Sequence, residues 1–340
     1  MSDEEAYAAF RAVRWAEGKP VCPHCGFDVA YEFKTRRLFK CKSCEKQFSV
    51  TSGTLFASRK LGLRDYLLAI AIFVNGVNGY AALQLSRDLN CDYKTAFVLA
   101  HKLREAMAAG RVRRRFRDFT EVRQSPPSEA HQLTGLVEVD GAVFGGHHKK
   151  QNEAKGRKDL RAISPKRKAV VTMRERRQGG RTLTFVFQSE AAAVATVAAY
   201  LHPTAALRTD EGAWWNVLRT RVKDFQKVNH TRHYSAGDGV HTNWVESFNG
   251  RLRRAEDVHR SISRNYLDRY AHEVAWREDH RRVSNGAQFS LAVRKAATLS
   301  GSDRMVGYWQ RRGPRSPRRP PPHIQYAIEA AKALAARQKP

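Results

Sequence analysis

The segment Leu136-Val-Glu-Val-Asp-Gly-Ala-Val-Phe144 decides the fold of the longest part of the chain. Its aliphatic and aromatic residues predict a buried β-strand. A carboxylate inside such a run is costly unless it has a function, and Asp140 closes the first five residues, Leu136-Val-Glu-Val-Asp. We therefore predict a strand over 136–144 that carries an acidic site residue.

The residues that follow this strand predict a mixed sheet. Further strands are predicted at Ala169–Met173, Thr182–Phe187 and Ala206–Thr209. Helical patterns lie at Ala191–Leu201, at Gly212–Val222 and from near Asn243 to about Arg282. Strands that first form a meander and then alternate with helices indicate a mixed α/β domain, which we place at residues 131–282.

Two more carboxylates complete a candidate metal site. Asp210 follows the strand Ala206–Thr209, and 35 residues separate it from Glu246. Carboxylates at the ends of adjacent strands converge, and with a third they can bridge two Mg²⁺ ions, or Mn²⁺, for in-line phosphoryl displacement. Asp140, Asp210 and Glu246 are therefore the predicted catalytic and magnesium-binding residues.

Each of the three carboxylates has a structural alternative. Asp140 and Asp210 could be turn formers at strand ends, and Asn243-x-x-Glu246 resembles a helix capping box. The ordered triple in a strongly basic chain favours the catalytic interpretation. The neighbouring Glu138, Glu211 and Asp238 are predicted to support the site or to lie on the surface.

The segment around Glu246 also carries predicted DNA contacts. It reads His241-Thr-Asn-Trp-Val-Glu-Ser-Phe-Asn-Gly-Arg-Leu-Arg-Arg254. Helical spacing places Glu246, Gly250 and Arg253 on one face, where the glycine leaves room for a phosphate backbone. Arg253 and Arg251 are the DNA contacts predicted on this helix.

Residues 1–56 contain two Cys-x-x-Cys pairs. Cys22-Pro-His-Cys25 and Cys41-Lys-Ser-Cys44 are separated by fifteen residues, which is the spacing of two knuckles that supply four thiolates to one tetrahedral Zn²⁺. A zinc ion with four protein ligands is closed to chemistry, so we predict a structural zinc ribbon. Its basic surroundings favour DNA as its partner, with protein contact as the alternative.

Residues 60–110 show helical periodicity. Tyr80–Met107 reads as a helix, a turn at Asn90-Cys-Asp-Tyr93 and a second helix, which resembles a helix-turn-helix. The second helix is predicted to carry polar residues on its exposed positions, and Lys94 and Lys102 are the predicted DNA contacts. A helical spacer is the alternative. The polar set is Lys94, Thr95, His101, Lys102 and Arg104.

The charge of the chain predicts a polyanionic partner. Lysine and arginine total 61 against 33 acidic residues, a formal charge of +28. The N-terminus is acidic and no run of about 18 apolar residues is present, so we predict a cytoplasmic, nucleoid-associated protein with no membrane partner.

Three further segments of the chain are also basic. Residues 111–130 have the composition of a linker, and residues 283–340 form a predicted Arg/Pro-rich extension. The loop after Gly145 carries Lys149 and Lys150, which are predicted to grip DNA, with a solvated run of charges as the alternative.

Taken together, these motifs resemble the DDE transposases of bacterial insertion sequences, in the group with an N-terminal zinc ribbon. The resemblance rests on the double Cys-x-x-Cys, Val137-Glu-Val-Asp-Gly-Ala-Val-Phe-Gly-Gly146, Thr209-Asp210 and His241-Thr-Asn-x-Val-Glu246. It covers about Cys22 to Arg254. Arg253 stands where the family usually has a lysine, and Gly141 where relatives often have an acidic residue.

The resemblance implies an RNase H-like fold for the mixed-sheet domain and a DDE triad of Asp140, Asp210 and Glu246. It implies binding of double-stranded DNA at terminal inverted repeats, cleavage that frees 3′ hydroxyls, and their attack on target DNA. A homodimer or larger assembly is expected when two ends are synapsed. A non-catalytic DNA-binding regulator and a nuclease without strand transfer are the two rival functions.

Overall fold

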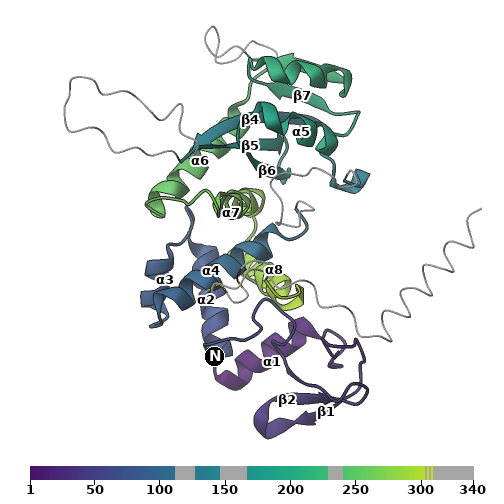
Figure 1. Cartoon of the computed structure of the whole chain (residues 1–340), viewed down its shortest axis with the longest axis vertical. Helices are drawn as coiled ribbons and strands as arrows, with labels where there is room; N and C mark the ends of the chain where they lie inside the picture. Colours follow the sequence, from purple (N-terminus) through teal and green to yellow (C-terminus); the bar gives the residue numbers. More distant parts are fainter. Residues whose placement is uncertain (112–126, 146–166, 229–239, 303–304, 306–307, 309–340) are drawn as a thin grey trace, which may run out of the picture. The chain divides into compact units, whose positions relative to one another are not determined.

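The computed structural model describes residues 1–111, 127–145, 167–228, 240–302, 305 and 308 (Figure 1). These residues divide into two compact units. One unit contains Met1–Ala71, Ser86–Ala106 and the described residues from Phe289 onward, and the other contains Ile72–Leu85 and Met107–Gln288.

The second unit is built on a five-stranded mixed sheet with the order β6-β5-β4-β7-β8, which confirms the predicted mixed α/β sheet. Strands β4, β5 and β6 form an antiparallel meander, whereas β7 runs parallel to both β4 and β8. Strand β8 was not predicted, because four residues with one aromatic give little signal. The strands are β4 (Leu136–Phe144), β5 (Lys168–Glu175), β6 (Thr182–Phe187), β7 (Ala206–Thr209) and β8 (Asp224–Lys227).

The two faces of this sheet are covered by different helices. Val137 and Val139 of β4 belong to a core that includes Val197 of α5 (Val194–Tyr200). On the opposite face, Ala142 and Phe144 belong to a core with residues of α6 (Asn243–Val258) and α7 (Leu267–His280). Since side chains alternate along a strand, residues 138 and 140 share the face of Ala142 and Phe144, where α6 packs.

The first unit contains the cysteine pairs. Its three-stranded antiparallel sheet consists of β1 (Ala30–Phe33), β2 (Leu38–Cys41) and β3 (Gln47–Ser49). An N-terminal helix, α1 (Asp3–Arg14), was not predicted; Ser2 and Glu5 form its capping box. Trp15 at the end of α1 meets Phe39 of β2 edge-on, at 5.2 Å between ring centroids.

Residues 60–110 form three helices, α2 (Leu63–Asn75), α3 (Ala82–Asp88) and α4 (Tyr93–Ala108), as their periodicity predicts. The assignment of the polar positions of α4 is wrong in part, because His101 and Arg104 are fully buried. When other elements cover a helix on several sides, packing decides which of its side chains are buried, whether or not they are polar. No described helix has both the length and the apolar character needed to cross a membrane.

The C-terminal region contains a helix that was not predicted. Helix α8 (Asn285–Thr298) lies within the predicted extension 283–340 and buries Ala292, Val293, Ala296 and Ala297. Residues 309–340 and the linker residues 112–126 lie outside the described part of the chain. The five domain limits therefore stay predictions.

Candidate functional site

Strand register brings Asp140 and Asp210 to neighbouring positions. The parallel pairing of β4 with β7 runs from Leu136↔Ala206 to Val139↔Thr209, so the residue that follows the paired stretch is an aspartate in both segments. Asp140 ends the apolar run Leu136–Asp140 but not the strand, since β4 continues to Phe144 in its pairing with β5, as the predicted bounds 136–144 imply. Asp140 directly follows the stretch that pairs with β7, and this is what places it beside Asp210.

Asp140 interacts electrostatically with both of the other predicted site carboxylates. Burial, then the charge of Asp210 and, more weakly, that of Glu246 raise the pKa of Asp140 to about 6. Two hydrogen bonds oppose this rise: the Gly141 N–H donates to Oδ1 at 2.8 Å, and Asn249 Nδ2 donates to Oδ2 at 2.8 Å. Asp140 therefore lies within electrostatic reach of both partners.

Sequence reasoning missed Asn249. It lies one turn after Glu246 on α6, is buried, and contacts Thr172 of β5 as well as Asp140, with 3.4 Å between Thr172 Oγ1 and Asn249 Oδ1. Its spacing of three from Glu246 places the two side chains on the same side of the helix, and this is the signal that could have identified it.

Sequence reasoning also missed Glu190, which precedes the short helical turn before α5. Burial and the charges of Asp210 and Asp140 raise the pKa of Glu190 to about 7. A Cβ atom built on Gly141 would lie 2.2 Å from the carboxyl carbon of Glu190, so the glycine leaves the space that this side chain fills. Nothing in the sequence around Glu190 indicates this position.

The oxygen atoms of these carboxylates are chemically suitable ligands for a divalent cation, but the carboxylates lie farther apart than the ligands of a bound ion. Oxygen ligands are those that Mg²⁺ prefers. Thr242 Oγ1 donates to Glu246 Oε1 at 2.7 Å, and the Gly212 N–H donates to Asp210 Oδ1 at 3.2 Å. In the described part of the chain, no three carboxylates form a cluster of metal-binding size; the four ribbon cysteines do.

The predicted DNA contacts on α6 lie in different environments. Arg253 is exposed, and its guanidinium lies over the ring of Phe144, 5.4 Å from the centroid. Gly250 has open space where a side chain would be. Arg251 lies about 140° around the helix axis from Glu246. It pairs with the buried Glu278 at 2.9 Å, an internal ion pair that occupies its guanidinium.

The predicted DNA contacts on α4 also differ. Lys94 is exposed, whereas Lys102 is half-buried and its Nζ donates to the backbone carbonyl of Ala57 at 3.4 Å. Burial lowers the pKa of Lys102. Lys149, Lys150 and Asp238 lie outside the described residues.

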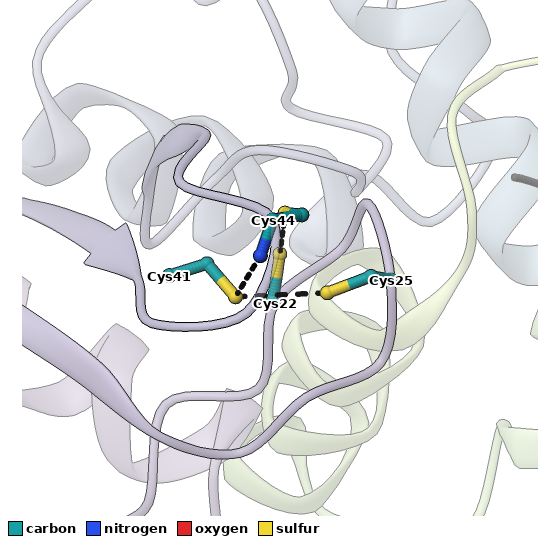
Figure 2. A group of neighbouring side chains, drawn as sticks. All are labelled: Cys22, Cys25, Cys41 and Cys44. Atoms are coloured by element: carbon teal, nitrogen blue, oxygen red, sulfur yellow. Dashed lines mark hydrogen bonds between the residues drawn. The ribbon is translucent and has the colours of Figure 1, made fainter. Parts of the chain in front are cut away.

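The four cysteines form a metal-binding site (Figure 2), in which their side chains point toward one another. The sulfurs of Cys22 and Cys44 are 3.7 Å apart, and those of Cys25 and Cys41 are 3.6 Å apart. A tetrahedral zinc with Zn–S distances of about 2.3 Å places its sulfurs about 3.8 Å apart. The donor set and its spacing therefore fit one structural Zn²⁺.

Backbone amides support these thiolates. The His24 N–H donates to Cys22 Sγ at 3.4 Å, and the Ser43 N–H donates to Cys41 Sγ at 3.3 Å. Such bonds stabilise a thiolate, and in the metal-free chain burial and the neighbouring thiols raise the pKa of Cys22 to about 12. A bound cation would offset this cost, so the module is expected to depend on its metal for folding.

Comparisons with known proteins agree with this division of the chain. Residues 132–279 match the ISXO2-like transposase domain, and residues 1–47 match the transposase zinc-ribbon domain. A Halobacterium salinarum protein described as an uncharacterized protein in transposable element ISH50 is 25% identical over 114 residues, which are 33% of this chain. The match spans 38% of that relative. No solved structure matches the chain.

Proposed function

We propose that the chain moves an insertion sequence by binding its terminal inverted repeats and joining their 3′ ends to target DNA, because residues 132–279 match the ISXO2-like transposase domain and residues 1–47 match the transposase zinc-ribbon domain. Asp140, Asp210 and Glu246 are the proposed catalytic triad, which would hold two Mg²⁺ ions. Bound there, the metals would activate the attacking water or hydroxyl and stabilise the leaving oxygen.

One observation carries this proposal: Asp140 and Asp210 each follow the last residue pair of the parallel strands β4 and β7, and the charges of Asp210 and Glu246 both raise the pKa of Asp140. Like charges gathered in a partly buried place destabilise the protein, which is expected where a cation neutralises them. Turn formers at strand ends would not need to converge. The capping-box alternative is also disfavoured, because the N-cap residue of α6 is Thr242 and not Asn243, and the Thr242 side chain makes no capping bond.

The protein residues hold and orient the reacting groups. Asn249 donates to Oδ2 of Asp140 and the Gly141 N–H donates to Oδ1, so the two bonds together would fix the orientation of this carboxylate. Arg253 is exposed and lies on the same face of α6 as Glu246, so it could bind a phosphate beside the triad. An arginine suits this role because it is always charged. Lys94 is the proposed contact on α4, while Arg251 and Lys102 are bound within the chain.

Three wider assignments accompany this proposal. The mixed-sheet domain is proposed to be RNase H-like, which its antiparallel meander followed by two parallel strands supports. The helices of residues 60–110 and the zinc ribbon are proposed to bind DNA. Synapsis of two ends would require a dimer or a larger assembly.

The decisive experiment compares the purified protein with Asp210→Asn on DNA that carries the ends flanking its gene, with Mg²⁺ and a target plasmid. Glu211→Gln is the matched control, because Glu211 is the next residue and is exposed. We expect joined products from the wild type and the control and none from Asp210→Asn or without Mg²⁺. Cleavage without joining would favour a nuclease, and tight binding without cleavage by any variant would favour a regulator.

A further inference from the structure

Glu138 is a fully buried carboxylate on β4, two residues before Asp140 on the same face of the sheet. Arg176 Nε donates to its Oε1 at 2.6 Å, and the same arginine donates to the backbone carbonyl of His241. Burying an ion pair brings little net stability, and a well-packed apolar residue would often serve the fold as well or better. The position of this pair therefore calls for another explanation.

The N-terminus of α6 supplies that explanation. The first turn of a helix has N–H groups without partners inside the helix, and usually the side chain of the preceding residue accepts one of them. Thr242 makes no such bond, and its hydroxyl donates to Glu246 instead. The Val245 N–H donates at 2.9 Å to Oε2 of Glu138, a residue 107 positions earlier in the chain.

Glu138 thus caps α6 from the sheet. A carboxylate at a helix N-terminus is stabilised both by the N–H groups and by the helix dipole. Because one oxygen binds Val245 and the other binds Arg176, the carboxylate cannot turn without losing one partner. The start of α6 is therefore held at a fixed distance from the strand that carries Asp140.

This link has a direct consequence for the proposed catalytic residues. Glu246 follows Val245 on the capped turn, and Asn249, which binds Asp140, lies on the next turn. We infer that Glu138 is a positioning residue, which caps α6 and so holds Glu246 opposite Asp140 in the site. The metal-binding part of this inference rests on the proposed function, whereas the capping part does not.

The test measures the cap and the metal site separately. Amide hydrogen exchange of the Val245 N–H reports the cap, and Mn²⁺ affinity, followed by the electron paramagnetic resonance of the free ion, reports the site. In Glu138→Gln the amide cannot accept from both Val245 and Arg176. We expect the protection of Val245 to fall about 10- to 100-fold, as for loss of a hydrogen bond to a charged group. We also expect the Mn²⁺ affinity to fall about tenfold or more, as for loss of a residue that orients ligands.

The matched control is Glu175→Gln. Glu175 is another fully buried glutamate of this sheet and pairs with Arg177 at 2.8 Å, but it binds the Thr134 and Arg181 N–H groups and not α6. Both variants remove the charge of a fully buried carboxylate that accepts from arginine and from backbone N–H groups, so thermal unfolding of the two variants measures the general loss of stability, apart from the cap. Only Glu138→Gln should lose Val245 protection and Mn²⁺ affinity. If it fails to fold, the double variant Glu138→Gln/Arg176→Gln removes the buried unpaired charge and should show the same two losses.

Three outcomes decide the matter. Unchanged protection of Val245 in the folded variant would overturn the cap, and equal loss of Mn²⁺ affinity in both variants would reduce Glu138 to a structural role. A wild-type protein that binds no Mn²⁺ would overturn the proposed function, and the exchange result would still establish or refute the cap.

Discussion

Asp140→Asn is expected to stabilise the metal-free protein at neutral pH. Burial and the charges of Asp210 and Glu246 raise the pKa of Asp140 from its ordinary value of 3.8 to about 6. At about 1.4 kcal/mol per pKa unit, this corresponds to about 3 kcal/mol of destabilisation when the group is ionised. Asparagine keeps the shape of the side chain and removes the charge, so most of this cost should disappear.

The sign of the effect follows from the two states. The folded-state pKa lies above the unfolded one, so the unfolded chain loses the proton first as the pH rises from about 4 to about 6. Wild-type stability should fall through this window, and the full penalty should remain above about pH 7. Asp140→Asn should therefore match the wild type near pH 3 to 4 and exceed it at pH 8. Mg²⁺ should remove the difference by stabilising the wild type alone.

Urea denaturation, followed by the fluorescence of the buried Trp215 and Trp276, measures this free energy of unfolding at pH 4 and pH 8, with chelator and with Mg²⁺. Asp257→Asn is the control, because Asp257 is an exposed aspartate on α6 and its loss should have little effect. A variant Asp140→Asn that is less stable than the wild type at pH 8 without metal would refute the reasoning. So would a difference of equal size at both pH values.

Three further predictions concern the zinc ribbon, the DNA contacts and Glu190. Cys44→Ser should reduce bound zinc from one ion per chain to none by elemental analysis and unfold the ribbon; retained zinc would contradict the four-thiolate site. Lys94→Ala should lower affinity for duplex DNA and the slope of log K against log salt by about one, whereas Lys102→Ala should leave the slope unchanged; equal slopes for both would contradict the assignment. Gly141→Ala should displace the flexible Glu190 side chain and lower the pKa of its carboxyl from about 7 at little cost in stability; an unchanged carboxyl titration by NMR would contradict the close approach.

Much of the fold was predictable because its signals are local. Strands β4, β6 and β7 have the predicted bounds, since runs of aliphatic and aromatic residues indicate buried strands. The four-cysteine site could be assigned from the spacing of the two knuckles alone, because four thiolates at that spacing have one common use. Local patterns likewise indicate the three proposed catalytic carboxylates, because Asp140 and Asp210 each end an apolar run and Glu246 lies in a helical segment.

Other features depend on residues that are distant in the chain, and only the tertiary structure places them. The register of β4 against β7 sets Asp140 beside Asp210, and the packing of α6 brings Asn249 to Asp140 and Val245 to Glu138. Glu190 reaches the site because Gly141 leaves it space. The sequence also could not predict the burial of His101 or the internal bonds of Arg251 and Lys102, because these too depend on distant segments of the chain. A local pattern indicates which face of an element is apolar, but the partner of a polar side chain depends on which distant segment packs against it.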